Sequence, residues 1–160
     1  MAEAPVITKI EVQQCSRTIK DIGREPGSGT PTYLPGAEME QSFYMTRVFT
    51  DKGIIGEYPL AADISRAAEL MLGHSALERG FFYAEYARYP MNLLGGVDTI
   101  LWDIAGKFHD ASVSELLGGF RKKLPAYAST MNGGVTGGLS TPESYADFAQ
   151  QCKEIGYTGF

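Results

Sequence analysis

Apolar and polar residues alternate with a period of two over the first third of the chain. The alternation around Ile10 and Val12 predicts a strand with one solvated face that continues to about Ile19. It returns over residues 39–50, and a glycine-containing turn then leads to a further strand at residues 54–58. The pattern therefore predicts a small antiparallel meander sheet.

The stretch between the first two predicted strands, residues 21–36, has a different composition. It contains seven glycines and prolines and few apolar residues that could anchor it. Such a composition is typical of an exposed connection, because glycine and proline punctuate regular structure. We expect a mobile loop here.

The period then changes to that of a helix. Ile64 and Leu72 bound the first apolar face, with Asp63 in the position of an N-cap and Gly73 in that of a helix end. A second helical pattern ends at Pro90. A third, longer pattern carries an apolar stripe that must pack against another surface, and its members are Leu93, Val97, Ile100, Leu101, Ile104 and Phe108.

The remaining segments predict one strand–helix unit. Ser112 and Glu115 have the spacing of a capping box, which predicts a short helix that Gly118 ends. Residues 124–129 are small and apolar almost throughout, as in a buried parallel strand. Thr141-Pro142 then fits the start of a helix, and residues 156–160 the start of a second strand.

Composition and charge narrow the classes of function. With 160 residues and 44% hydrophobic content, the chain can bury a sizeable core. The formal net charge of -5 argues against nucleic acid or an anionic membrane as a partner, and no apolar run is long enough to span a bilayer, so we expect a cytoplasmic protein. Cys15 and Cys152 lack the spacing of a metal site and are interpreted as unpaired thiols.

Three segments carry a resemblance to a known family. Residues 97–107 (VDTILWDIAGK), 112–119 (SVSELLGG) and 124–130 (LPAYAST) together resemble the domain junction of the mandelate racemase/muconate lactonizing enzyme branch of the enolase superfamily. The resemblance implies an α+β capping domain at residues 1–123, made of the meander sheet and a helical bundle. It implies that residues 124–160 are the first βα unit of an incomplete (β/α)8 barrel. Because such a barrel takes about 250 residues, we expect the N-terminal portion of a longer enzyme.

The resemblance also implies a reaction. Members of this branch abstract a proton alpha to a carboxylate as racemases, cycloisomerases or acid-sugar dehydratases, and a Mg2+ ion offsets the charge that develops on the carboxylate oxygens. The expected substrate is a small hydroxy acid or sugar acid, and the full-length enzyme is expected to be a homo-oligomer. The family's catalytic residues and metal ligands would follow Phe160. We therefore expect neither in this chain, and we expect the chain alone to be inactive.

The substrate contacts expected from the resemblance lie in the two capping loops, residues 21–36 and 51–56. Within them Arg24 would pair with an anionic tail, whereas Tyr33, Ile54 and Ile55 would wall the substrate. Composition alone favours the alternative that these loops are solvent-exposed connections, and it is the resemblance that favours substrate contacts for the loops as a whole.

Two further candidates, Ser129 and Asn132, follow the predicted barrel strand at the end where barrel enzymes place their sites. A hydroxyl or an amide there can hydrogen-bond a substrate carboxylate. The competing interpretation is that Asn132 shapes the turn into Gly133-Gly134.

Trp102, Asp103 and Lys107 are interpreted as scaffold, because their helix carries a complete apolar stripe. The resemblance implies that this helix docks the cap against the barrel, so the stripe is expected to stay partly exposed without it. Asp103 and Lys107 are spaced for an ion pair. The alternative to an enzyme is a non-catalytic, stand-alone binding or oligomerisation module.

Overall fold

The computed structural model describes residues 3–61, 63–88, 93–129 and 138–160, with the side chains of residues 93–95 excepted. The chain forms two compact units. Residues 1–15 and 42–120 make up the first unit, and residues 16–41 and 121–160 make up the second. The two long N-terminal strands contribute to both.

The sheet of the first unit confirms the predicted meander. Strands β1 (Ile7–Arg24), β2 (Pro31–Thr50) and β3 (Ile55–Leu60) lie in the order β1-β2-β3. β2 and β3 are antiparallel, and their register places Tyr44 opposite Leu60. The turn between them is closed by a side chain as well as by the backbone, because the Thr50 hydroxyl donates to the Ile54 carbonyl at 2.9 Å.

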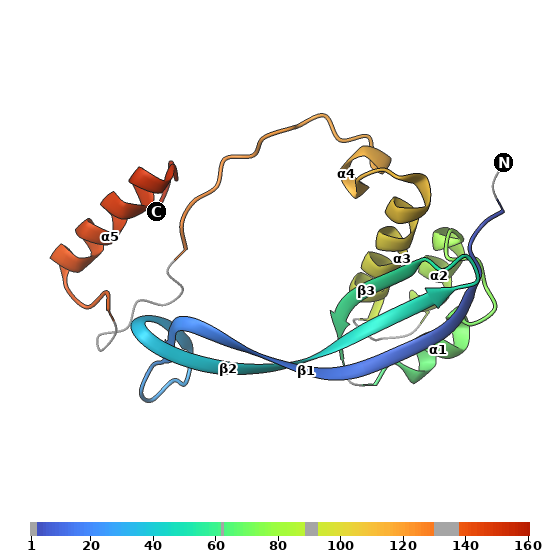
Figure 1. Cartoon of the computed structure of the whole chain (residues 1–160), viewed down its shortest axis with the longest axis horizontal. Helices are drawn as coiled ribbons and strands as arrows, with labels where there is room; N and C mark the ends of the chain where they lie inside the picture. The colour runs from blue at the N-terminus through green and yellow to red at the C-terminus, as the bar shows by residue number, and fades with distance from the viewer. Residues whose placement is uncertain (1–2, 62, 89–92, 130–137) are drawn as a thin grey trace. The chain divides into compact units, whose positions relative to one another are not determined.

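Helices α1 (Ser65–Met71), α2 (Arg79–Tyr86) and α3 (Leu93–His109) gather on one side of this sheet (Figure 1), and the short α4 (Val113–Leu116) follows them. The core is formed by apolar side chains from β1, β2, the helices and the segments next to the helices. Its members are Ile7, Val48, Ile64, Ala67, Met71, Ala76, Phe82, Tyr86, Val97, Ile100, Leu101 and Ile104.

The apolar stripe of α3 is buried inside this unit. Val97, Ile100, Leu101 and Ile104 are each at most 1% exposed. α3 and β3 approach so closely that a Cβ at Gly56 would lie 2.8 Å from the Ile100 carbonyl oxygen. The expectation that this stripe stays partly exposed is wrong for these four residues, because the unit's own sheet and helices provide the surface that covers them.

The helix ends follow local chemistry. The capping box at α4 is confirmed, because the Ser112 hydroxyl accepts from the Glu115 N–H and the Glu115 carboxylate accepts from the Ser112 N–H. The prediction that Asp63 is the N-cap of α1 is wrong by one residue: Ile64 is the N-cap, and the Asp63 carboxylate accepts from the Ser65 N–H at 3.0 Å. Gly73 follows α1 with a φ of 81°, a conformation that favours glycine.

The predicted loop at residues 21–36 is wrong. β1 continues to Arg24 and β2 begins at Pro31, so only residues 25–30 form the connection. β3 pairs with β2 only between Tyr44 and Phe49, so residues 31–43 of β2 have a strand neighbour on one side only among the described residues. Prolines are tolerated at such an edge, which explains why a proline-containing segment forms a strand. We call residues 16–41 the outer hairpin.

In the second unit, α5 (Pro142–Ile155) confirms the predicted helix. Thr141 caps its start, and Gly156, with a φ of 112°, ends it. The strand predicted at residues 124–129 does not form in the described part of this segment. A single parallel bridge joins Tyr127 to Gly159 instead, and the Ala128 N–H donates to the Gly159 carbonyl at 2.9 Å. A barrel strand needs neighbours on both edges, and one bridge does not provide them.

Candidate functional site

The two isoleucine candidates lie at the β2–β3 turn of the first unit. Ile54 is half-buried and packs against the core, so it contributes to the fold as well as to the surface. Ile55 begins β3, and its carbonyl accepts a hydrogen bond from the Lys107 Nζ at 2.6 Å. The expected second capping loop is therefore a short turn. Ile54 anchors it to the core, and Lys107 bonds its backbone at Ile55.

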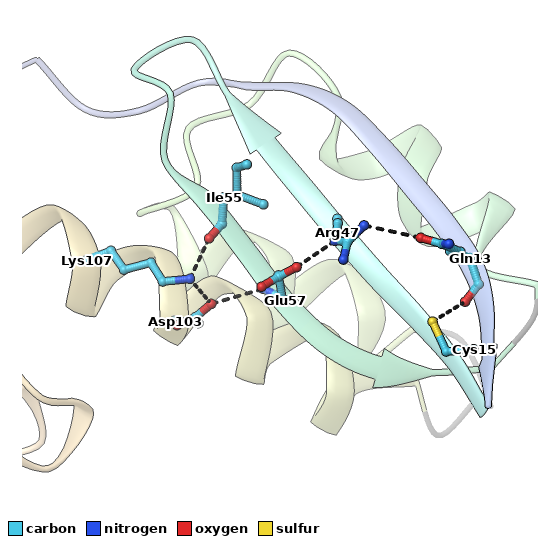
Figure 2. Close-up of polar contacts among 7 residues, drawn as sticks. All are labelled: Gln13, Cys15, Arg47, Ile55, Glu57, Asp103 and Lys107. Carbon is cyan, nitrogen blue, oxygen red and sulfur yellow. Dashed lines mark hydrogen bonds and ion pairs between the residues drawn. The ribbon is translucent and has the colours of Figure 1, made fainter. Parts of the chain in front are cut away.

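A chain of polar contacts runs from this turn across the sheet, as Figure 2 shows. Lys107 Nζ lies 2.7 Å from Asp103 Oδ2, and the same carboxylate oxygen accepts from the backbone N–H of Glu57 at 3.0 Å. The Glu57 side chain in turn accepts from Arg47 Nε at 2.6 Å, and Arg47 Nη1 donates to Gln13 Oε1 at 3.2 Å. These contacts join α3 to β3, β2 and β1.

This geometry supports a structural role for Asp103 and Lys107. The predicted ion pair forms, but both residues also hold backbone groups of β3, and so they dock α3 within the first unit. The bond to Glu57 raises the pKa of Arg47 above its ordinary value, which keeps the guanidinium charged. The cluster therefore fastens α3 to the sheet of the first unit.

No pattern in the sequence indicated the partners of Trp102. The guanidinium carbon of Arg79 lies 3.3 Å from the centroid of the Trp102 ring, and Arg79 Nη2 lies 2.7 Å from Asp98 Oδ1. The same arginine thus makes a cation–π contact and an ion pair with α3. Trp102 is therefore part of the α2–α3 packing.

Two other candidates lie in the outer hairpin. The exposed Arg24 donates from Nη1 to the Gly29 carbonyl at 2.8 Å, so it stabilises the connection that it precedes. The half-buried Tyr33 points to α5, and its ring centroid lies 4.9 Å from that of Phe148. Its carbonyl also accepts from the Gly138 N–H at 3.3 Å. Neither residue lies in the loose loop that composition predicted.

The last two candidates lie at the end of the expected barrel strand. Ser129 is exposed, and Asn132 lies outside the described residues. The described parts of the chain contain no group of three His, Cys, Asp or Glu side chains that could hold a metal ion. A shallow hollow in the second unit is lined mostly by apolar side chains and backbone, at Leu124, Pro125, Ala126, Ile155, Gly156, Tyr157 and Thr158.

Comparisons with known proteins decide the family. No family model matches the chain. The crystal structure of D-glucarate dehydratase from Agrobacterium tumefaciens, complexed with magnesium, is 30% identical to it, covers 95% of it and has a TM-score of 0.75. A member of the enolase superfamily from Polaromonas sp. JS666 is 26% identical, covers 95% of the chain and has a TM-score of 0.68. The chain belongs to the enolase superfamily.

A curated enzyme agrees with this assignment over part of the chain. D-galactonate dehydratase from Cronobacter sakazakii (strain ATCC BAA-894) is 37% identical over 75 residues, or 46% of this chain and 19% of that enzyme. The chain spans 43% of the solved glucarate dehydratase and 42% of the Polaromonas structure. It thus corresponds to less than half of these enolase-superfamily relatives.

The family fits the architecture of the first unit, in which a three-stranded antiparallel sheet packs with helices as expected for an enolase-superfamily capping domain. A muconate cycloisomerase from Azorhizobium caulinodans, 20% identical with a TM-score of 0.65, shares this fold. Among the described helices, none combines the length and the apolar character needed to cross a bilayer.

Proposed function

We propose that this chain is the capping portion, with the start of the barrel, of a magnesium-dependent acid-sugar dehydratase of the enolase superfamily. The observation that carries the proposal is the likeness to D-glucarate dehydratase, which has 30% identity over 95% of the chain. The same likeness supports residues 1–123 as the cap and residues 124–160 as the first barrel unit.

The reaction class rests on the relatives described above that have the higher sequence identity. D-glucarate dehydratase and D-galactonate dehydratase are 30% and 37% identical over the matched residues, and both names describe the dehydration of a sugar acid. The muconate cycloisomerase is 20% identical, a level at which only the fold is informative. Sugar-acid dehydration is therefore favoured over racemisation and cycloisomerisation.

Magnesium would supply the charge that stabilises an enediolate, because a divalent cation lowers the energy of developing negative charge on carboxylate oxygens. Since the described residues contain no ligand cluster, we propose that the ligands come from elsewhere in the enzyme. This chain would contribute substrate contacts instead. Arg24 would attract the anionic substrate, Tyr33, Ile54 and Ile55 would shape its enclosure, and Ser129 and Asn132 would bind its carboxylate.

The test is a hybrid enzyme in which this chain replaces the matching part of the Agrobacterium D-glucarate dehydratase. Dehydration of D-glucarate and D-galactonate with MgCl2 is followed by trapping the keto-acid product with semicarbazide. We expect turnover by the hybrid and none by the 160-residue chain alone. A correctly folded hybrid that turns over neither acid would contradict the proposal and favour a non-catalytic binding or oligomerisation module.

Matched variants of the hybrid test the substrate contacts. Tyr33→Ala is expected to raise KM by roughly ten-fold or more if the ring packs on substrate, while Mg2+ affinity stays the same. Its control is Tyr83→Ala on α2, where the tyrosine is 66% exposed. Arg24→Ala is compared in the same way with Arg88→Ala, an exposed arginine paired with Glu85 on α2. Equal KM values for each variant and its control would show that Tyr33 and Arg24 do not contact the substrate.

Light scattering of the hybrid tests the expected homo-oligomer. We expect a mass that is a multiple of one chain, as in most soluble oligomers with closed symmetry. A monomeric hybrid with full activity would remove oligomerisation from the proposal.

A further inference from the structure

The outer hairpin is fastened to the segment around α5 within the second unit. The ring centroids of Tyr33 and Phe148 lie 4.9 Å apart with the planes tilted by 49°, a geometry typical of attractive aromatic pairs. Phe148 also contacts the Phe160 ring at a centroid distance of 5.8 Å, so it is the middle member of an aromatic cluster. Tyr33 contributes the ring of the outer hairpin to this cluster.

A second contact fixes the same place through the backbone. The Gly138 N–H donates to the Tyr33 carbonyl at 3.3 Å, and a Cβ at Gly138 would lie 2.8 Å from Pro35 Cγ and closer still to Pro35 Cδ. A side chain at this position would meet the Pro35 ring, so the close approach of the two segments requires a glycine. The two chain segments therefore touch along β2 from Tyr33 to Pro35.

The hairpin tip is itself ordered by hydrogen bonds. The Glu25 N–H donates to the Thr30 carbonyl at 3.0 Å, and the Gly29 N–H donates to the Glu25 carbonyl at 2.9 Å. Arg24 adds its bond to the Gly29 carbonyl. The tip is therefore ordered internally, and β2 is fastened to the α5 segment at Tyr33.

We propose that Phe148 and Gly138 are positioning residues, which hold the outer hairpin through Tyr33 so that Tyr33 and Arg24 present a fixed edge to the substrate; the catalytic part of this proposal rests on the proposed function. Phe148 acts through Tyr33 and does not touch the reacting atoms. The hairpin consequently forms one side of the substrate site, and α5 sets its position. Substrate preference therefore also depends on Phe148 and Gly138, which lie outside the hairpin.

The first experiment uses the 160-residue chain and measures hydrogen exchange at the Gly138 amide, which bonds to Tyr33. Phe148→Ala is expected to speed this exchange roughly two- to ten-fold, the range that the loss of one aromatic pair predicts. Phe148→Tyr keeps the ring and should retain the protection. The control is Phe81→Ala, which removes a ring stacked on His74 in the first unit and should leave the Gly138 amide unchanged.

A compensating pair makes the test independent of Phe148. Gly138→Ala is expected to speed exchange because the new Cβ meets the Pro35 ring, and Pro35→Ala in the same chain removes Cγ and Cδ and should restore slow exchange. Pro35→Ala alone serves as the reference. Unchanged exchange in Phe148→Ala, or a double variant that exchanges as fast as Gly138→Ala, would overturn the fastening.

The second experiment measures kinetics in the hybrid enzyme. Phe148→Ala should raise KM for the sugar acid several-fold with a smaller change in kcat and the same Mg2+ affinity, and Phe148→Tyr should restore KM. A purely structural role would lower the active fraction, and hence kcat, without changing KM, and would contradict the positioning role. An inactive hybrid overturns the proposed function and the catalytic part of this proposal, whereas the exchange measurements judge the fastening by themselves.

Discussion

Two buried threonines of β2 provide a pair of opposite predictions from one chemical change. Thr46 is 0% exposed, and its hydroxyl has no hydrogen-bond partner among the described residues. Thr50 is 7% exposed, and its hydroxyl donates to the Ile54 carbonyl at 2.9 Å and accepts from the Ile54 N–H at 3.1 Å. Replacement by valine keeps the shape and the branching at Cβ in both cases and removes only the hydroxyl.

The magnitudes follow from hydrogen bonding. A buried hydroxyl without a partner costs about 1–3 kcal/mol, so Thr46→Val is expected to raise the free energy of unfolding by about 1–2 kcal/mol. Thr50→Val removes two bonds and leaves the Ile54 N–H to find another partner, so it should lower the free energy of unfolding by about 1–3 kcal/mol. Each kcal/mol corresponds to a shift in Tm of about 4–8 °C for a unit of this size.

The assay uses the single tryptophan of the chain, Trp102, which lies on α3 in the first unit and reports on the unfolding of that unit. Urea titrations of the wild type and both variants, followed by Trp102 fluorescence, give the two changes in free energy. If Thr46→Val destabilises the unit, or if both variants shift in the same direction, the assignment of hydrogen-bond partners along β2 is wrong.

Three further predictions concern the same unit. Gly56→Ala should lower the free energy of unfolding by about 1–3 kcal/mol, because its Cβ would meet the Ile100 carbonyl oxygen at 2.8 Å; a neutral result in urea titration would show that α3 can move away from β3. Lys107→Met should destabilise the unit by less than about 1 kcal/mol, because its ion pair is part-exposed, and the loss should shrink as salt is added; an effect that does not depend on salt would contradict an ionic contribution. The bond from the Val6 N–H lowers the pKa of Asp51 below its ordinary 3.8, so the stability that Asp51 contributes is present above that value and is lost as the pH falls through the folded pKa. Asp51→Asn should therefore flatten the dependence of Tm on pH below about pH 4, and an acid limb like that of the wild type would refute this role.

Local signals predicted the parts of the fold that local chemistry determines. The cap at Ser112 was predicted because Glu115 lies three positions further along the chain, and the cap at Thr141 was predicted because Pro142 follows it directly. The β2–β3 pairing was predicted because alternation and a short turn fix its register.

Long-range partners were not predictable in this way. The α3 stripe identifies a buried face, but an amphipathic pattern does not say which surface covers that face. The contact of Asp103 with Glu57 joins residues 46 positions apart, and that of Lys107 with Ile55 joins residues 52 positions apart. Residues 21–36 were predicted to be a loop from their composition. They belong mostly to strands because a neighbouring strand and a free sheet edge, which composition does not reveal, allow them to pair.

The candidate site was predictable only through the resemblance. The residues at 97–130 identify the family, and the likeness to D-glucarate dehydratase confirms it. The contacts that decide what Tyr33 and Arg24 do, with Phe148 and Gly29 respectively, have no signature in the sequence around them. Their substrate contacts remain predictions for the hybrid enzyme.

The interleaving of the two units has a consequence for synthesis on the ribosome. The outer hairpin is translated early, but α5, which carries its aromatic partner, begins only at Pro142. About 100 residues separate the two segments, which corresponds to roughly 5–20 s at 5–20 residues per second. During that interval Tyr33 and its neighbours lack the surface that covers them in the finished chain. The hairpin must therefore avoid aggregation until α5 has been translated. Its many glycines and prolines disfavour strand pairing between molecules, which suits a segment whose packing partner is translated so much later.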